Sequence, residues 1–139
     1  MIQRTRAINQ FADAACAAVG LHDLYGRFTA AAVIDDDDGT ILDMRPFAGE
    51  EACVVCAVEW ALNVAEGWHA AHRVVLLSGG GAPLRDARED DIRMYQTLRE
   101  ALDVDGIELV DWIQTDGDDI RSLTFTCDIT PNWDDQPAS

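Results

Sequence analysis

Two pairs of possible metal ligands stand out, each with a spacing of three residues: Cys53 and Cys56, then His69 and His72. Thiolates and imidazoles at such spacings occur in zinc sites, and a Cys-x-x-Cys pair also occurs in redox-active dithiols. The apolar residues around the cysteines predict a helix interior, whereas structural zinc pairs usually lie on loops. The histidines are equally well explained by the negative end of a helix. We therefore expect buried free thiols at all four cysteines, Cys16, Cys53, Cys56 and Cys127.

Four consecutive carboxylates, from Asp35 to Asp38, could in principle bind calcium. An EF-hand loop needs acidic residues at alternate positions and a glutamate at its twelfth position. The twelfth position counted from Asp35 is Pro46, so the pattern fails. Because Gly39 follows the acidic run directly, we expect a solvated hairpin turn instead.

A glycine run at residues 79–81 is followed by two arginines. The backbone N–H groups of such a loop, together with the guanidinium groups, could surround a small phosphate-bearing ligand. The Gly-Lys-Ser/Thr sequence of a Walker A loop is missing, so this is not a nucleotide-binding loop of that type. The residues of this possible ligand loop are Gly79, Gly80, Gly81, Arg85 and Arg88.

The apolar pattern predicts the elements that would position these residues. Strands are expected at residues 28–34, 40–44, 74–77, 107–113 and 120–127, where apolar runs or alternation are bounded by Gly, Pro or Asp. Helices are expected at residues 2–19, 49–66 and 88–102, where apolar residues recur with helical spacing. We expect Gly20 to end the first helix and Pro46 to end the second strand. Residues 1–127 would form one domain, followed by a polar tail at 128–139.

The stretch from Arg88 to Leu123 has Gly106-Ile107 after its predicted helix, Asp111-Trp112 in the alternating strand that follows, and Ser122-Leu123 at its end. In this it resembles the second half of a RadC-type JAB/MPN domain. Members of that family have a Gly-Ile pair after a helix, an alternating strand that ends in Asp-His, and a final Ser-Leu. The order of predicted elements over residues 28–127 is also similar. The resemblance implies an α/β fold with two or three layers, a mixed central sheet and the architecture of cytidine deaminases.

The resemblance also implies where a metal site would lie. The family binds zinc through His-x-His and an aspartate that opens the next helix, with an upstream glutamate as acid/base. The matching positions here are Ser78, Gly80, Asp91 and Met44. Glycine has no ligand atom, and a serine hydroxyl is a poor zinc donor beside imidazole. We therefore expect no bound metal or other cofactor, and a metal site that has degenerated.

The charge of the chain limits the classes of partner. Its 139 residues include 26 acidic residues against 10 basic ones, all arginine, which gives a net charge of −16. An acidic surface repels phosphate backbones, so direct nucleic-acid binding is not expected. No apolar run approaches the roughly 18 residues of a membrane-spanning helix, and no signal-peptide pattern opens the chain. These patterns predict a cytoplasmic protein with reduced thiols.

Three functions are compatible with these observations. The first is a non-catalytic RadC-like JAB/MPN domain that acts as a protein-interaction or scaffold module, with a protein partner or as a homodimer. The second is a zinc-dependent hydrolase or deaminase-like enzyme with a non-standard site. Cys56 and Glu59 superficially resemble a deaminase site, but their spacing is one residue too long for the ligand-x-Glu motif. The third is binding of a small anionic ligand at the glycine loop.

Overall fold

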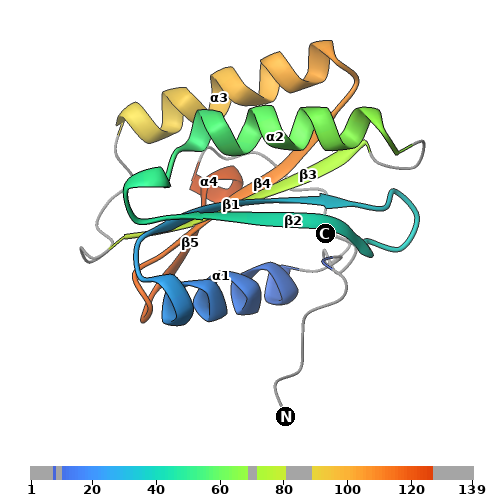
Figure 1. The fold of residues 1–139 in the computed structure, drawn as a ribbon. Coiled ribbons are helices and arrows are strands. Elements are labelled where there is room, and N and C mark those ends of the chain that lie inside the picture. Colours follow the sequence, from blue (N-terminus) through green and yellow to red (C-terminus); the bar gives the residue numbers. More distant parts are fainter. Residues whose placement is uncertain (1–7, 9–10, 69–71, 81–88, 127–139) are drawn as a thin grey trace, which may run out of the picture.

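A five-stranded sheet in the order β2-β1-β3-β4-β5 forms the centre of the molecule (Figure 1). The computed structural model describes residues 8, 11–68, 72–80 and 89–126. The strands are β1 Phe28–Ile34, β2 Ile41–Ala48, β3 Arg73–Gly79, β4 Glu108–Thr115 and β5 Ile120–Ser122. Strands β3 and β4 run parallel, and the other neighbouring pairs are antiparallel. The sheet is therefore mixed, as predicted.

Helices cover both faces of this sheet (Figure 1). They are α1 Phe11–Tyr25, the short 3-10 turn η1 Gly49–Glu51, α2 Val54–Glu66, α3 Glu89–Val104 and α4 Leu123–Thr126. Helix α1 lies on one face, and α2 and α3 lie side by side on the other. The chain is thus an α/β protein with three layers, one of the two arrangements predicted.

The core between α1 and the sheet contains many small side chains. Ala14, Ala17 and Ala18 of the helix share a buried cluster with Ala30 and Ala32 of β1. Small side chains on both elements allow the helix to approach the sheet closely. Larger residues complete this cluster: Ile8, Leu21, Phe28, Ile34, Val75, Leu77, Val110 and Ile113.

The second core fills the space between the sheet and helices α2 and α3. Tyr95 and Leu102 of α3 are buried here against Leu76 of β3 and Trp112 of β4. Because helices cover both faces, every residue of β4 after Glu108 is buried. The alternation of residues 107–113 predicted a half-buried strand, and that detail was wrong since the polar residues of β4 are also enclosed.

Helix α1 does not end where the sequence predicts. It continues through Gly20 to Tyr25, and the N–H of Gly26 donates to the carbonyl oxygen of His22 at 2.8 Å. Gly26 has a φ of +70°. A left-handed glycine directly after a helix is the usual C-terminal stop signal. The prediction placed this signal at the wrong glycine, because Gly20 lies in the helix interior.

Strand β2 runs through Pro46, which was predicted to end it. Pro46 pairs with Ala30 of β1, and β2 is an edge strand of the sheet. An edge strand bonds to a neighbour on one side only, so it tolerates a residue that lacks an N–H donor. The prediction of a strand end at Pro46 was therefore wrong.

The last predicted strand, 120–127, is shorter than expected. Strand β5 stops at Ser122, and α4 follows at once. The carboxylate of Asp111 accepts hydrogen bonds from the Ser122 hydroxyl at 2.5 Å and from the N–H of Thr124 at 3.1 Å. The buried Asp111 carboxylate thus accepts a hydrogen bond from a backbone N–H in the first turn of α4, in the way that an N-cap side chain does, and this stabilises the helix start.

The helix predicted at 49–66 has a later start. Residues Gly49–Glu51 form η1, and α2 begins at Val54 with Cys53 as its N-cap residue. The acidic pair Glu50-Glu51, which indicated a helix start, belongs to the 3-10 turn. Cys53 and Cys56 therefore lie at a helix N-terminus, and their predicted place in a helix interior was wrong.

The described part of the chain has no helix with the length and apolarity that crossing a membrane would require. The predicted tail at 128–139 and the N-terminal residues 1–7 lie outside the described residues. The division into a domain at 1–127 and a tail stays a prediction.

Candidate functional site

The carboxyl end of β3 carries Ser78, which matches a metal-ligand position of the JAB/MPN pattern. Its hydroxyl oxygen accepts a hydrogen bond from Nε1 of Trp112 at 2.8 Å. Trp112 belongs to the core cluster under α2 and α3, so Ser78 faces that side of the sheet. The indole N–H thus occupies a lone pair of the serine oxygen.

Asp91, the one carboxylate among the predicted metal positions, lies in the first turn of α3. Its Oδ2 accepts a hydrogen bond from Nε2 of Gln114 at 3.3 Å. The side-chain carbonyl of Gln114 in turn accepts from Nε and Nη2 of Arg121, at 2.9 and 2.6 Å. Gln114 pairs in register with Ser78 across β3 and β4. We call these five residues the β3–β4 polar network: Ser78, Asp91, Trp112, Gln114 and Arg121.

The glycine loop begins at a crowded point of the structure. A Cβ added at Gly79 would lie 2.7 Å from Cε1 of Phe28 and 3.1 Å from Cδ2 of His22. The carbonyl oxygen of Gly80 accepts a hydrogen bond from Nε2 of His22 at 3.2 Å. Gly79 and Gly80 are thus held against α1, and the first of them has to be small. Gly81, Arg85 and Arg88, the other residues of the possible ligand loop, lie outside the described residues.

The structure does not bring Met44 to the polar network. Met44 pairs with Ala32 of β1 and packs against the core cluster that lies under α1. Ser78 faces the opposite side of the sheet, toward the core that contains Trp112. The four predicted metal positions are therefore divided: Ser78 and Asp91 belong to the network, Met44 lies on the other face, and Gly80 is hydrogen-bonded to His22 of α1.

The described residues contain no group of three or more His, Cys, Asp or Glu side chains that could hold a metal ion. Asp91 is the one carboxylate among the predicted metal positions, and its Oδ2 accepts a hydrogen bond from the Gln114 amide. Protein zinc sites use three or four side chains of Cys, His, Asp or Glu, so Asp91 alone does not make such a site.

The acidic run forms a turn in which carboxylates accept hydrogen bonds from backbone N–H groups of the same turn. Oδ1 of Asp35 accepts from the N–H of Asp37 at 2.8 Å, and Oδ1 of Asp38 accepts from the N–H of Thr40 at 2.8 Å. The hydroxyl and N–H of Thr40 lower the pKa of Asp38 below its usual value. These bonds are typical of Asx turns, in line with the predicted hairpin turn.

His72 lies close to the C-terminal residues of α2, as expected, because it lines a surface hollow together with Ala65 and Glu66. Helix α2 ends at Glu66, and His72 comes directly before β3. Its ring Nδ1 lies 2.6 Å from Oδ2 of Asp36, and its backbone N–H donates to Oδ1 of the same residue at 2.9 Å. The pair joins the β1–β2 turn to the start of β3. His69 lies outside the described residues.

The three cysteines within the described residues are free but less enclosed than predicted. Cys16 and Cys56 are exposed, and Cys53 is partly buried. The expectation of buried thiols was wrong for these three, because each lies at a helix surface or terminus, away from the two core clusters. Cys127 lies outside the described residues.

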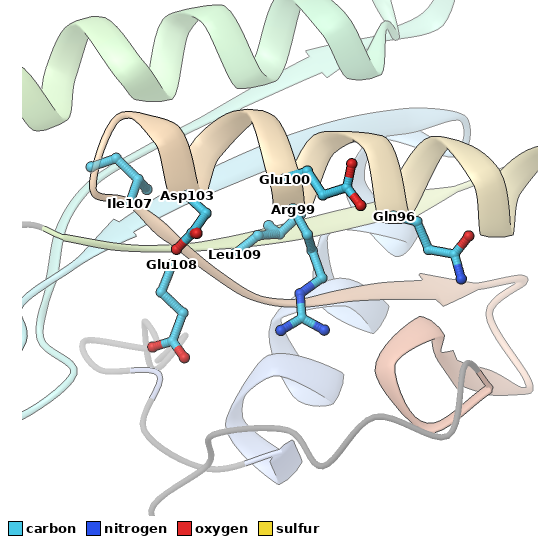
Figure 2. Close-up of a pocket in the computed structure, with 7 residues that line it drawn as sticks. All are labelled: Gln96, Arg99, Glu100, Asp103, Ile107, Glu108 and Leu109. Atoms are coloured by element: carbon cyan, nitrogen blue, oxygen red, sulfur yellow. The ribbon is translucent and has the colours of Figure 1, made fainter.

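Two surface hollows lie apart from the polar network. The larger, of about 480 Å³, runs along α3 beside the start of β4 and is lined by Gln96, Arg99, Glu100, Asp103, Ile107, Glu108 and Leu109. Figure 2 shows Arg99 and Glu108 extending to the same side of α3. Three carboxylates and one guanidinium group line this open groove, which favours neither an anion nor an apolar ligand.

The smaller hollow, of about 290 Å³, lies where α2 and α3 end and includes Trp68, His72 and Asp105. Trp68 is 47% exposed, and Val104, directly before Asp105, is 87% exposed. Two large apolar side chains are therefore exposed at the end of the molecule where α2 and α3 end. We call Trp68 and Val104 the α2–α3 apolar end.

No protein-family model matches the sequence, and comparison with curated proteins found no match. The resemblance to JAB/MPN domains therefore stays a prediction that depends on the residues quoted above. Sequence reasoning missed Gln114, Arg121 and His22 as members of this region. The sequence indicated only the contact of Gln114 with Arg121, because consecutive strands β4 and β5 joined by a short turn form a hairpin that pairs these two residues.

Proposed function

We propose that this chain is a non-catalytic, RadC-like JAB/MPN-type domain that works by binding another protein chain. One observation carries the proposal: Ser78 and Asp91, which the resemblance matches to metal-ligand positions, accept hydrogen bonds from Trp112 and Gln114. These bonds within the protein support a domain of this type that works without a metal. The mixed sheet between helical layers is compatible with this architecture.

The non-catalytic part of the proposal is tested by calorimetric titration of the full chain with zinc chloride. We expect no stoichiometric binding attributable to Asp91, so that Asp91→Asn leaves the titration unchanged. The double variant Ser78→His with Gly80→His supplies the two imidazoles that the resembled pattern requires. A Cβ at Gly80 meets no atom within 4 Å, so a side chain can begin there without a backbone shift.

The double variant is expected to gain one zinc site, and adding Asp91→Asn to it should remove that site. Circular dichroism checks that both variants stay folded. If the folded double variant gains no zinc, the placement of Ser78, Gly80 and Asp91 on the metal positions is wrong. If the original chain binds one zinc through Asp91, the non-catalytic assignment is wrong.

The binding part of the proposal is supported by the α2–α3 apolar end. Trp68 and Val104 are both exposed at the same end of the molecule, and exposed apolar side chains can form part of an interaction surface. The net charge of −16 limits which proteins can bind, because it acts on any charged partner. A partner with a basic surface would be attracted at low ionic strength, and a second copy of this chain would be repelled. The charge therefore favours a different protein over a homodimer.

Affinity capture from cells of the source organism, at two salt concentrations, tests this. We expect a captured protein with a basic surface that is lost at high salt and lost with Trp68→Ser plus Val104→Ser. The control is Leu24→Ser, a residue of α1 that is 75% exposed. Capture that is unaffected by the double substitution, or a chain that only forms homodimers in sedimentation, would contradict the proposed partner.

A further inference from the structure

The first turn of α2 places two thiols next to each other. Cys53 is the N-cap residue, and its Sγ accepts a hydrogen bond from the backbone N–H of Cys56 at 3.4 Å. Residues three apart at the start of a helix have Cβ atoms roughly 5–6 Å apart. A disulfide needs its Cβ atoms about 3.5–4.5 Å apart, so a small adjustment of the first turn suffices to join the two sulfurs.

Both sulfurs are accessible to a reagent. Cys56 is exposed, Cys53 is partly buried, and Val55 between them is 51% exposed. The N-cap position of Cys53 leaves its sulfur at the positive end of the α2 dipole, where a thiolate is stabilised. The pair is therefore an accessible dithiol whose two members differ in their surroundings.

That difference separates the two thiols chemically. Hydrogen bonds from the Cys56 thiol, and next from the Cys56 backbone N–H, lower the pKa of Cys53. The same thiol contact and partial desolvation raise the pKa of Cys56. Repulsion by the nearby Glu59 carboxylate raises both pKa values to a smaller extent. Cys53 is thus suited to attack as a thiolate, and Cys56 is suited to act second.

We propose that Cys53 and Cys56 form a thiol–disulfide exchange site that accepts a disulfide bond from a small disulfide compound and passes it to a dithiol. The proposed function excludes catalysis at the JAB/MPN metal positions only, and this separate activity at the start of α2 does not depend on it. Its substrate class is a low-molecular-weight disulfide, and its product is an intramolecular Cys53–Cys56 disulfide.

The exchange proceeds in two balanced steps. The Cys53 thiolate attacks one sulfur of the substrate, the substrate S–S bond breaks, and the leaving thiolate is protonated by water. A mixed disulfide at Cys53 results. The Cys56 thiol then loses its proton to solvent and attacks Sγ of Cys53, which releases the second substrate half as a thiol. The protein loses two hydrogen atoms and the substrate gains them; a dithiol reverses both steps.

Incubation of the full chain in glutathione buffers of varied redox ratio, followed by acid quench and peptide mapping, tests the exchange. We expect a Cys53–Cys56 disulfide that forms and disappears reversibly with the ratio. Cys56→Ser should stop the reaction at a mixed disulfide on Cys53, and Cys53→Ser should abolish the rapid reaction. Cys16→Ser, at an exposed thiol of α1, should change nothing at the pair. Mixed disulfides that form at Cys53 no faster than at Cys16 would overturn the proposal.

The pH dependence of Cys53 alkylation provides a second test, which a merely structural role would not affect. Glu59→Gln removes a negative charge that opposes the thiolate, so the midpoint for Cys53 should shift to lower pH. Cys56→Ala removes the thiol that donates to Cys53, so the midpoint should shift to higher pH. If neither variant shifts the midpoint, Cys53 is not activated by these neighbours and the proposal fails.

Discussion

At the scale of single residues, two glycines decide how closely α1 meets the end of the sheet. The ring of His22 lies between Gly79 of β3 and Gly117 of the β4–β5 turn, and a Cβ at either glycine would come within 3.1 Å of that ring. The sequence suggested an accessible ligand loop at residues 79–81. The structure instead gives the first glycine of that loop a packing role, because it leaves space for His22 and Phe28.

Replacing Gly79 with alanine should therefore destabilise the protein. The added methyl group would lie 2.7 Å from Cε1 of Phe28, which is fully enclosed in the core. Overpacking of this kind typically costs about 1–3 kcal/mol. Urea unfolding measures the loss. Gly80→Ala is the matched control, since its Cβ meets no atom within 4 Å, and an equal loss in both variants would contradict the packing argument.

A second prediction at this scale concerns the acidic turn. The Thr40 hydroxyl is the largest cause that lowers the pKa of Asp38, followed by the Thr40 N–H. Thr40→Val removes the hydroxyl, so the pKa of Asp38 should rise toward 3.8, its usual value. A lowered pKa in the folded state gives stability that is present above the unfolded pKa and lost as the pH falls through the folded pKa. As the pH falls below about 3.8, the free energy of unfolding should therefore decrease less in Thr40→Val than in the original chain.

Carbon-detected NMR titration of the Asp38 carboxyl group measures this pKa directly. Thr40→Ser keeps a hydroxyl at the same position and should leave the titration of Asp38 close to that of the original chain. A Thr40→Val variant that titrates like the original would show that the hydroxyl does not bind the carboxylate.

At the scale of elements, the sequence predicted which segments are helices and strands better than it predicted where they end. The strand at 74–77 and the helix at 88–102 agree with β3 and α3 within a few residues. The errors occurred at Gly20, at Pro46, at the start of α2 and at Ser122, where β5 is followed by α4. These ends depend on features that the local apolar pattern does not contain, such as the edge position of β2 and the hydrogen bond from Thr124 to Asp111.

Gly20 allows this explanation to be measured. A glycine in a helix interior costs roughly 0.5–1 kcal/mol relative to alanine, and a Cβ at Gly20 meets no atom within 4 Å. Gly20→Ala should therefore stabilise the protein by that amount in urea unfolding. Gly26→Ala should do the opposite, because Gly26 has a φ of +70° that suits the end of α1. Destabilisation by Gly20→Ala would mean that α1 ends near residue 20 as the sequence predicted.

At the scale of the whole molecule, the α/β class and the mixed sheet were predicted as what the JAB/MPN resemblance implies, and the structure has both. The partners within the polar network could not be predicted, because they join residues far apart in the chain, such as Asp91 with Gln114. The separation of Met44 from Ser78 also depends on strand register, and a shift of one residue moves a side chain to the other face. Net charge, in contrast, is a property of the sequence alone and acts on the entire fold.

That charge predicts how the stability of the folded chain responds to salt. With 26 acidic and 10 basic residues, the compact state suffers net repulsion among carboxylates. Sodium chloride shortens the screening length from roughly 30 Å at 0.01 M to about 8 Å at 0.15 M. The melting temperature should therefore rise over this range, where specific salt effects are still small.

The variant Asp37→Asn with Asp118→Asn removes two exposed carboxylates and should show both a higher melting temperature at low salt and a smaller rise with salt. A melting temperature that falls with salt would mean that the ion pairs of the fold, such as Arg93 with Glu89 at 3.4 Å, outweigh the repulsion.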